Sequence, residues 1–277
     1  MKLQKTLFLF LIAMLSLTTA IQTCAQTAPS GKAYQQMSAT ERSAFVAEQA
    51  RRIGRELSGN EYEFTPEFVT IMQKSVDEYA VRIGNKGGDR LGKTDVRVVL
   101  ERGQAQAPAL MAAFRARNVS PLLGLYIPLV ESEYVNIQQP NSVGAIGMYQ
   151  FLPKTGERFG LSPQDLLDVG KSADAAARYI TKNLEQFKDD PMKEALALLA
   201  YNRGEGQTAR DLKLYVNDKN RQCSICALTA ASDQLDETFR DENVFYVPRF
   251  FAAAIIGENP EAFGLQMRAL STFETRR

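Results

Sequence analysis

Residues 122–155 read LLGLYIPLVESEYVNIQQPNSVGAIGMYQFLPKT. The first part of this stretch is apolar on nearly every side of a helix, which is typical of a helix buried in a protein core. Ser120-Pro121 precedes it and favours a helix start. Proline has no amide hydrogen, but amides in the first turn of a helix have no partner within the helix, so no hydrogen bond is lost there. Glu131, the first charged residue after Arg117, ends the apolar run. The stretch therefore predicts a buried helix that carries one carboxylate at its end.

Helical patterns dominate on both sides of this stretch. The expected helices lie at 39–57 behind a Ser38–Glu41 capping box, at 66–83 behind Thr65-Pro66, as two short helices within 94–117, at 153–159, from Ser172 to about 187, from Asp190-Pro191 to about 204, and from Asp241-Glu242 onward. No stretch alternates apolar and polar residues as a half-buried strand would. We therefore predict an all-α or nearly all-α fold.

The N-terminus has the pattern of an export signal, in which two lysines precede an apolar run over 7–17 and small residues follow. Cleavage is expected after Ala25, with cleavage after Ala20 as the alternative. Cys24 raises the possibility of a lipid anchor, which we favour less because residues 21–23 are a poor lipidation context. The sequence thus predicts an exported protein of the periplasm or cell envelope.

Charge and residue usage exclude several classes of function. The formal charge is +1, and loss of the two leader lysines would leave 1 − 2 = −1, so nucleic acid is not an expected partner. The chain has no histidine, which removes Ser-His and Cys-His nucleophiles and most zinc sites. In an exported protein, Cys223 and Cys226 favour a small loop disulfide over a metal half-site, with a redox role as the weaker alternative. Neither a metal nor a cofactor is expected.

Residues 87–94 match the phosphate-loop pattern G-x-x-x-x-G-K-T. That motif binds phosphate only between a buried strand and a helix, where backbone amides surround the ligand. The segment before it has helical periodicity instead. We therefore predict a loop between two helices in which Thr94 caps the second helix, and no nucleotide partner.

Glu131 is the strongest candidate for chemistry. A carboxyl at the end of a buried helix is desolvated, so its pKa should rise, and a carboxyl that stays protonated near neutral pH suits a general acid. The alternative is an ordinary helix-end charge that reaches solvent. Glu133, two residues later, points elsewhere and is expected to be a surface charge.

The glycine-spaced segment after Glu131 is the second candidate. Gly144 and Gly147 allow a ligand to approach the backbone closely, or they simply permit the loop to turn. Tyr149, Gln150 and Phe151 offer the aromatic and amide contacts that hold sugars, although the same residues could serve the core.

Two polar residues farther along the chain complete the candidates. Asn202 follows an apolar helix and could bind a polar ligand or cap that helix. Tyr246 lies in an apolar helix, and its hydroxyl needs a partner if it is buried. The carboxyl of Glu131 would serve as that partner.

Four motifs in this order resemble the soluble lytic transglycosylase (SLT) catalytic domain, and most closely that of the membrane-bound lytic murein transglycosylase D group. The motifs are LVES at 129–132, GAIGMYQFLPKTG at 144–156, AYNRG at 200–204 and ExxxYVP at 242–248. The resemblance implies a lysozyme-like α fold over 119–270, preceded by a helical N-terminal region over 26–118 and the signal over 1–25. It also implies cleavage of the β-1,4 bond between N-acetylmuramic acid and N-acetylglucosamine in the glycan strands of peptidoglycan.

The resemblance also assigns roles to residues. Glu131 would be the catalytic acid and base, and Tyr246 would orient it. The residues implied to contact substrate are Asn141, Ser142, Gly144, Ala145, Met148, Tyr149, Gln150, Tyr201 and Asn202. Two positions depart from the family pattern: Asn141 stands where a serine is usual, and Tyr149 stands where the D-like group often has tryptophan, so a stacking contact with a smaller ring is expected.

The motifs supply one carboxylate, whereas ordinary glycosidases use two. One carboxylate fits a lytic transglycosylase, in which Glu131 first protonates the leaving oxygen and then deprotonates the C6 hydroxyl that closes a 1,6-anhydro ring. The alternatives are a goose-type lysozyme-like hydrolase, with Asp190 or Glu205 as its second carboxylate, and a non-catalytic glycan-binding or scaffold protein.

Overall fold

The computed structural model describes residues 31–85, 87–88 and 90–273, so the expected export signal lies outside the described residues. Its α-helices are α1 (Ala39–Ser58), α2 (Pro66–Ala80), α3 (Val96–Arg115), α4 (Pro121–Ser132), α5 (Pro153–Arg158), α6 (Val169–Gln186), α7 (Lys193–Arg203), α8 (Glu205–Tyr215), α9 (Ser224–Ala230), α10 (Glu237–Asp241) and α11 (Tyr246–Glu258). Short 3₁₀ turns are η1 (Tyr34–Gln36), η2 (Asp165–Leu167), η3 (Arg221–Cys223), η4 (Ser232–Gln234), η5 (Asn243–Phe245), η6 (Pro260–Phe263) and η7 (Leu270–Thr272). The β-pairing found in this part of the chain is limited to two isolated bridges. The all-α prediction is confirmed.

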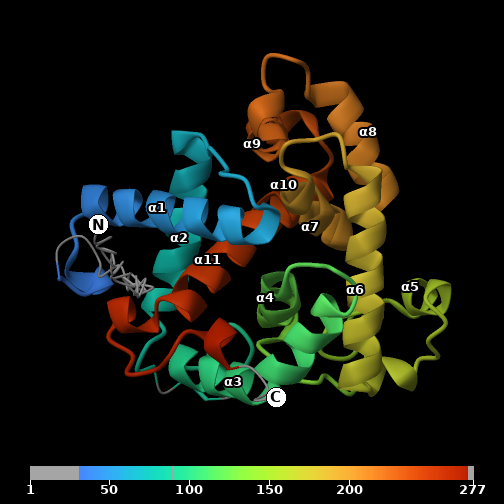
Figure 1. Ribbon diagram of the computed structural model, residues 1–277, viewed down its shortest axis with the longest axis horizontal. Coiled ribbons are helices and arrows are strands. Elements are labelled where there is room, and N and C mark those ends of the chain that lie inside the picture. Colours follow the sequence, from blue (N-terminus) through green and yellow to red (C-terminus); the bar gives the residue numbers. More distant parts are fainter. Residues whose placement is uncertain (1–30, 86, 89, 274–277) are drawn as a thin grey trace, which may run out of the picture.

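Helix α4 lies at the centre of the molecule. It contacts α3 along its length and also packs against α1, α6 and α11. Figure 1 shows α6 on one side of it and α1, α2 and α11 on the other. The apolar side chains of α4 from Leu122 to Leu129 are almost entirely buried, and each contributes about 2 kcal/mol through removal from water. This burial fixes the position at which Glu131 leaves the helix.

One backbone carbonyl of α4 has no hydrogen-bond donor within the helix, and the loop after the helix supplies one. Pro128 has no amide hydrogen to donate to the carbonyl of Gly124, four residues earlier. The hydroxyl of Tyr149 donates to that carbonyl at 3.0 Å. Gly124 is also required for packing, because a Cβ there would lie 2.6 Å from Cδ2 of Phe114 on α3. The 144–151 segment is therefore attached directly to the central helix.

The predicted starts of the first two helices are confirmed. Ser38 and Glu41 form the expected capping box at the start of α1. The Thr65 hydroxyl accepts from the amide of Phe68 at the start of α2, with proline at the first helical position. Both helices thus begin where their capping residues satisfy amides that the helix itself leaves unbonded.

The segment expected to form two short helices is one helix, α3. Pro108 lies inside it. Gly103, which would also weaken a helix, is needed there because a Cβ would lie 2.6 Å from Cε2 of Tyr134. Asp95, and not Thr94, caps α3 by accepting from the amide of Arg97 at 3.0 Å. The prediction of a break was wrong because packing against α4 outweighs the local preferences.

Three other predicted helix starts shift. α7, expected to start at Asp190-Pro191, begins at Lys193 with no side-chain cap. α6 begins three residues before Ser172, because the carboxylate of Asp168 accepts from the amide of Lys171 and acts as the cap. α11 begins at Tyr246, after the 3₁₀ turn η5, and not at 241. Among the described residues, no helix combines the length and apolar character needed to cross a bilayer.

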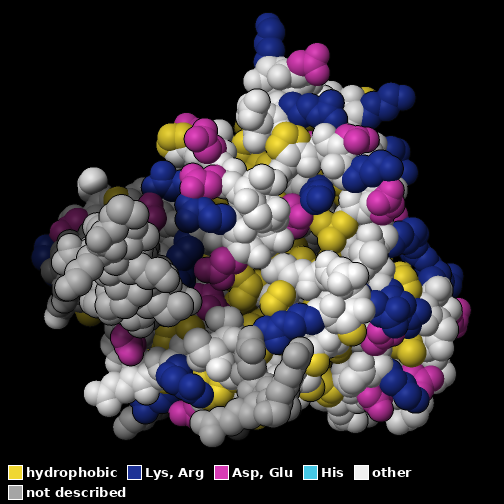
Figure 2. Space-filling model, in the orientation of Figure 1, with side chains coloured by type: hydrophobic (Ala, Val, Ile, Leu, Met, Phe, Trp, Pro, Cys, Tyr) yellow, Lys and Arg dark blue, Asp and Glu magenta, His cyan; other side chains and the backbone are white. Residues whose placement is uncertain are grey.

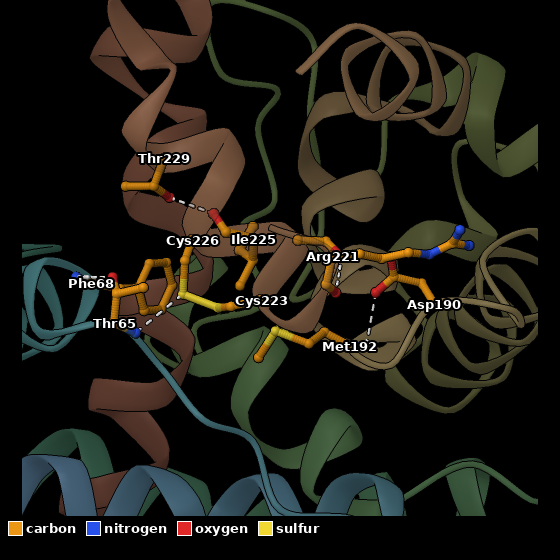
Figure 3. Close-up of a disulfide and its surroundings, with 10 residues drawn as sticks. Thr65, Phe68, Asp190, Met192, Arg221, Cys223, Ile225, Cys226 and Thr229 are labelled. Carbon is orange, nitrogen blue, oxygen red and sulfur yellow. Dashed lines mark hydrogen bonds between the residues drawn. A yellow bond between two sulfur atoms is a disulfide. The ribbon is translucent and has the colours of Figure 1, made fainter. Parts of the chain in front are cut away.

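Figure 3 shows the disulfide between Cys223 and Cys226, whose Cα atoms are 5.2 Å apart. It joins the turn η3 to the first residues of α9. The sulfur of Cys226 accepts a hydrogen bond from the amide of Thr65 at 3.4 Å. Since Thr65 caps α2, the disulfide contacts the start of the helix whose other end reaches the site described below.

We expect Tyr149→Phe to lower the free energy of unfolding by about 1–3 kcal/mol, because it leaves the buried Gly124 carbonyl without its donor. Urea unfolding followed by circular dichroism would measure the change. Tyr215→Phe is the matched control, since it removes a hydroxyl that donates to a backbone carbonyl at the exposed surface. Equal losses in the two variants would contradict the proposed attachment.

Candidate active site

The carboxyl of Glu131 meets the hydroxyl of Tyr246 at the centre of the site. Glu131 lies in the last turn of α4, and Tyr246 is the first residue of α11. The Tyr246 hydroxyl donates to Oε1 of Glu131 at 2.6 Å. Burial raises the pKa of Glu131 from 4.5 to about 7, and the hydrogen bond from Tyr246 partly opposes this rise because it stabilises the carboxylate. Near neutral pH, the carboxyl is therefore poised between its acid and base forms.

The chain turns sharply after Glu131. Glu133 and Tyr134 both adopt left-handed backbone conformations, with φ of 50° and 61°. Glu133 is only 7% exposed and forms an ion pair with Arg82. It also accepts from the amide of Gly92 at 3.1 Å, so this amide of the phosphate-loop pattern binds a carboxylate of the chain itself. The prediction that Glu133 is a surface charge was wrong, since Glu133 attaches the region after α2 to the end of α4.

Glu131 lines a cavity of about 630 Å³ that is bounded by α2, α4, α11 and the loop before α3. Tyr79 and Arg82 contribute from α2 and the residues after it, Lys93 from the loop, and Arg249 from α11. The walls of the cavity thus come from both sides of the expected boundary at 118/119.

The charges around the cavity are mixed. Glu78 and Glu133 line it together with Arg82, Lys93 and Arg249. On the coloured part of the face in Figure 2, basic and acidic side chains are likewise interleaved. The site therefore does not present the single basic field that a nucleic-acid backbone would require.

The loop after Glu131 is held by its own side chains. Asn141 accepts from the amides of Val143 and Ala145 at 3.0 and 2.9 Å and donates to Gln150 at 3.2 Å. Gln150 in turn donates to the carbonyl of Gly147 at 2.7 Å. Its φ of +49° is strained for a residue with a side chain, and such strain is concentrated at functional sites.

Gly147 is fixed by a close backbone approach. Its φ is +78°, and a Cβ there would lie 2.3 Å from the carbonyl oxygen of Leu166. Its amide donates to the carbonyl of Ile137 at 2.9 Å, in one of the two β-bridges. Gly147 therefore serves the geometry of the loop.

Three residues expected to contact substrate are buried: Ala145, Met148 and Tyr149. Tyr149 is 0% exposed, and its ring stacks on Phe114 at 6.3 Å. The expectation that the Tyr149 ring stacks on a sugar is wrong, because the ring is used to fill the core and to complete α4. Asn141 and Ser142 are exposed, whereas Gly144 and Gln150 are partly exposed.

Tyr201 and Asn202 lie at the end of α7, where Tyr201 is near the carboxyl of Glu131 and Asn202 contacts the turn η5 that precedes Tyr246. The Tyr201 hydroxyl donates to the carbonyl of Tyr149 at 2.8 Å. Its pKa is raised, mainly by burial and also by the nearby negative charge of Glu131. Asn202 is exposed, and its Oδ1 accepts from Nδ2 of Asn243 at 2.7 Å.

The two carboxylates considered as a second acid are engaged elsewhere. Asp190 accepts from the Ser224 hydroxyl at 2.5 Å and lines a separate cavity. Glu205 pairs with Arg158 and Lys182 and accepts from the Tyr179 hydroxyl at 2.9 Å. Glu78, which does line the cavity of Glu131, was missed because it lies far upstream on a helix that carries no motif.

Comparison with known proteins bears on part of the chain. Residues 109–223 match the family described as Transglycosylase SLT domain. The X-ray structure of an inactive mutant of lytic transglycosylase Slt from Pseudomonas aeruginosa resembles this one with a TM-score of 0.41 and 19% sequence identity, over 83% of this chain and 36% of that one. No curated protein matches the sequence. The matched range, 109–223, includes Glu131, Gln150 and Asn202.

Proposed function

We propose that this protein is a peptidoglycan lytic transglycosylase. It would cleave the β-1,4 bond between N-acetylmuramic acid and N-acetylglucosamine and leave a 1,6-anhydromuramic acid end. The observation that carries the proposal is the Glu131 carboxyl with its pKa near 7, bonded to Tyr246 at the wall of a cavity. The SLT domain supports peptidoglycan as the substrate class, and the four ordered motifs support membership of the D group.

The proposed reaction needs one group that acts first as an acid and then as a base. Protonated Glu131 donates its proton to the glycosidic oxygen as the bond from C1 to that oxygen breaks, while the acetamido group of the substrate stabilises the cation. The Glu131 carboxylate then accepts the proton of the C6 hydroxyl as its oxygen bonds to C1. A pKa close to the working pH suits both steps, because neither form of the carboxyl is scarce.

The proposed substrate contacts follow the exposure of the side chains. Asn141, Ser142, Gln150 and Asn202 can reach bound sugar with their side chains, while Ala145, Met148 and Tyr149 can offer only backbone. Export to the periplasm or envelope is part of the proposal, because peptidoglycan lies there and because the N-terminal sequence has the pattern of an export signal.

A lysozyme-type hydrolase is the second candidate, and the position of Glu78 favours it. Glu78 lines the cavity that contains Glu131 and forms no ion pair with the described residues. A second carboxylate in the same cavity could activate a water molecule. The two reactions differ in their products by one water molecule, so mass spectrometry separates them.

We expect the wild-type protein to release anhydromuramic fragments from purified peptidoglycan, and Glu131→Gln to reduce this release by at least about 100-fold, since it removes the general acid. Glu78→Gln is the matched control and should leave the rate nearly unchanged. Mass spectrometry of the digests measures both. Products heavier by one water, together with loss of activity in Glu78→Gln, would favour the hydrolase.

The rate should fall by about tenfold per pH unit above pH 7, because the acid form of Glu131 is lost as pH rises through its pKa. Tyr246→Phe should raise that pKa further, since it removes a bond that stabilises the carboxylate. The descending limb of the pH–rate profile should therefore move to higher pH, with a lower maximum. A limb that moves to lower pH would contradict this role of Tyr246.

Burial of Glu131 should also lower stability at alkaline pH. A carboxyl with a folded-state pKa raised from 4.5 to about 7 contributes stability fully below pH 4.5 and loses it as pH rises through 7. Between pH 5 and 8 the wild type should lose on the order of 2 kcal/mol more unfolding free energy than Glu131→Gln. Urea titrations at the two pH values test this, and parallel losses would contradict it.

A further inference from the structure

A buried arginine lies behind the exposed Asn202. The side chain of Arg203 is 3% exposed, and its guanidinium stacks over the ring of Phe239 at 4.9 Å. It pairs with Asp211 at 2.5 Å and with Asp236 at 2.6 Å. Its third partner is Asn243: Nη1, which also donates to Oδ1 of Asp236 at 3.2 Å, donates to Oδ1 of Asn243 at 2.9 Å. The bond to Asn243 is not needed to neutralise the charge of Arg203, and it orients an amide.

The chain of bonds from Arg203 fixes the orientation of two amides. Arginine can only donate, so the oxygen of Asn243 must face Arg203 and its amino group must point away. That amino group donates to Oδ1 of Asn202 at 2.7 Å. Asn202 must therefore present its oxygen to Asn243, which leaves its own amino group as the free polar end. Neither amide can be flipped without placing two donors or two acceptors against each other.

The orientation is set within one turn of the residue that holds Glu131. Asn243 lies in η5 and Tyr246 follows three residues later at the start of α11. Tyr246 bonds Glu131, while Asn243 bonds Asn202, the neighbour of Tyr201. The same short segment therefore holds both the carboxyl and the exposed amide.

We propose that Arg203 and Asn243 are positioning residues that present the Asn202 side chain as a hydrogen-bond donor to bound sugar. The proposal rests on the proposed function, since it names a contact with the glycan. Sugar hydroxyls both donate and accept, but the carbonyl of an N-acetylated amino sugar only accepts. A fixed donor therefore always matches that carbonyl, whereas an amide free to rotate would often turn its own oxygen toward it.

Two substitutions of Asn243 separate orientation from packing. In Asn243→Asp, the carboxylate still accepts from Arg203 but cannot donate, so Asn202 must rotate and turn its oxygen toward the sugar. In Asn243→Leu, the volume is similar but both bonds are lost, and the Asn202 amide rotates freely. Stability should decrease in the order wild type, Asn243→Asp, Asn243→Leu, because Asn243→Asp keeps the bond with Arg203. Sugar binding should decrease in the order wild type, Asn243→Leu, Asn243→Asp.

The measurement is calorimetric titration of an N-acetylglucosamine oligomer at pH 7.5 into the full chain carrying Glu131→Gln, with and without each Asn243 substitution. We expect about tenfold weaker binding with Asn243→Asp and a smaller loss with Asn243→Leu. Thermal unfolding of the same proteins gives the stability order. Asn217→Asp adds an equal charge at an exposed loop residue that can keep its bond to the amide of Lys219, and it should bind like its parent.

A result in which Asn243→Asp is more stable than Asn243→Leu but binds the oligomer more weakly would support the proposal, because a merely structural role would make binding follow stability. Unchanged binding with Asn243→Asp, or a loss that parallels thermal stability, would overturn it. If the Glu131→Gln parent does not bind the oligomer and the wild type releases no fragments from peptidoglycan, the proposed function itself fails and this inference fails with it. Binding by the parent without any effect of Asn243→Asp removes this inference alone.

Discussion

The hydrogen bond from Tyr246 to Glu131 is the interaction on which the rest of the site depends. It joins two helices whose residues are 115 positions apart in sequence, and it lies where both helices leave the apolar core. Burial favours the protonated carboxyl, while the tyrosine hydroxyl favours the carboxylate. The balance between these two effects sets a pKa near 7 with no neighbouring cation required.

Several polar groups near this carboxyl are paired with other segments of the chain. Ser132 donates to the carbonyl of Met148 at 2.8 Å, Tyr201 donates to the carbonyl of Tyr149, and Glu133 pairs with Arg82. Each bond also connects the end of α4 to a different segment. An unpaired polar group in the protein interior costs free energy. These bonds therefore stabilise the fold and also hold the site in one geometry.

The candidate site is larger than the matched domain. Residues 109–223 include Glu131 and Asn202, but Arg82 lies before this range, and Asn243 and Tyr246 lie after it. The cavity is closed on one side by α2, which packs against α11. The N-terminal helices are thus part of the wall of the cavity, and a fragment limited to the matched range would lack the partners that hold its two key polar residues.

The sequence by itself determined the helical class, the caps of α1 and α2, and the desolvation of Glu131, because periodicity and capping are local and a helix that is apolar all round has to be buried. Only the tertiary structure decided that Tyr149 completes α4, that Glu133 is buried beside Arg82, and that Asn243 orients Asn202. A sequence pattern shows which side chains must leave water. Apart from the Glu131–Tyr246 pair, which was expected from the sequence, it does not show which polar groups meet once they have left water, because those partners come from segments more than 20 residues apart.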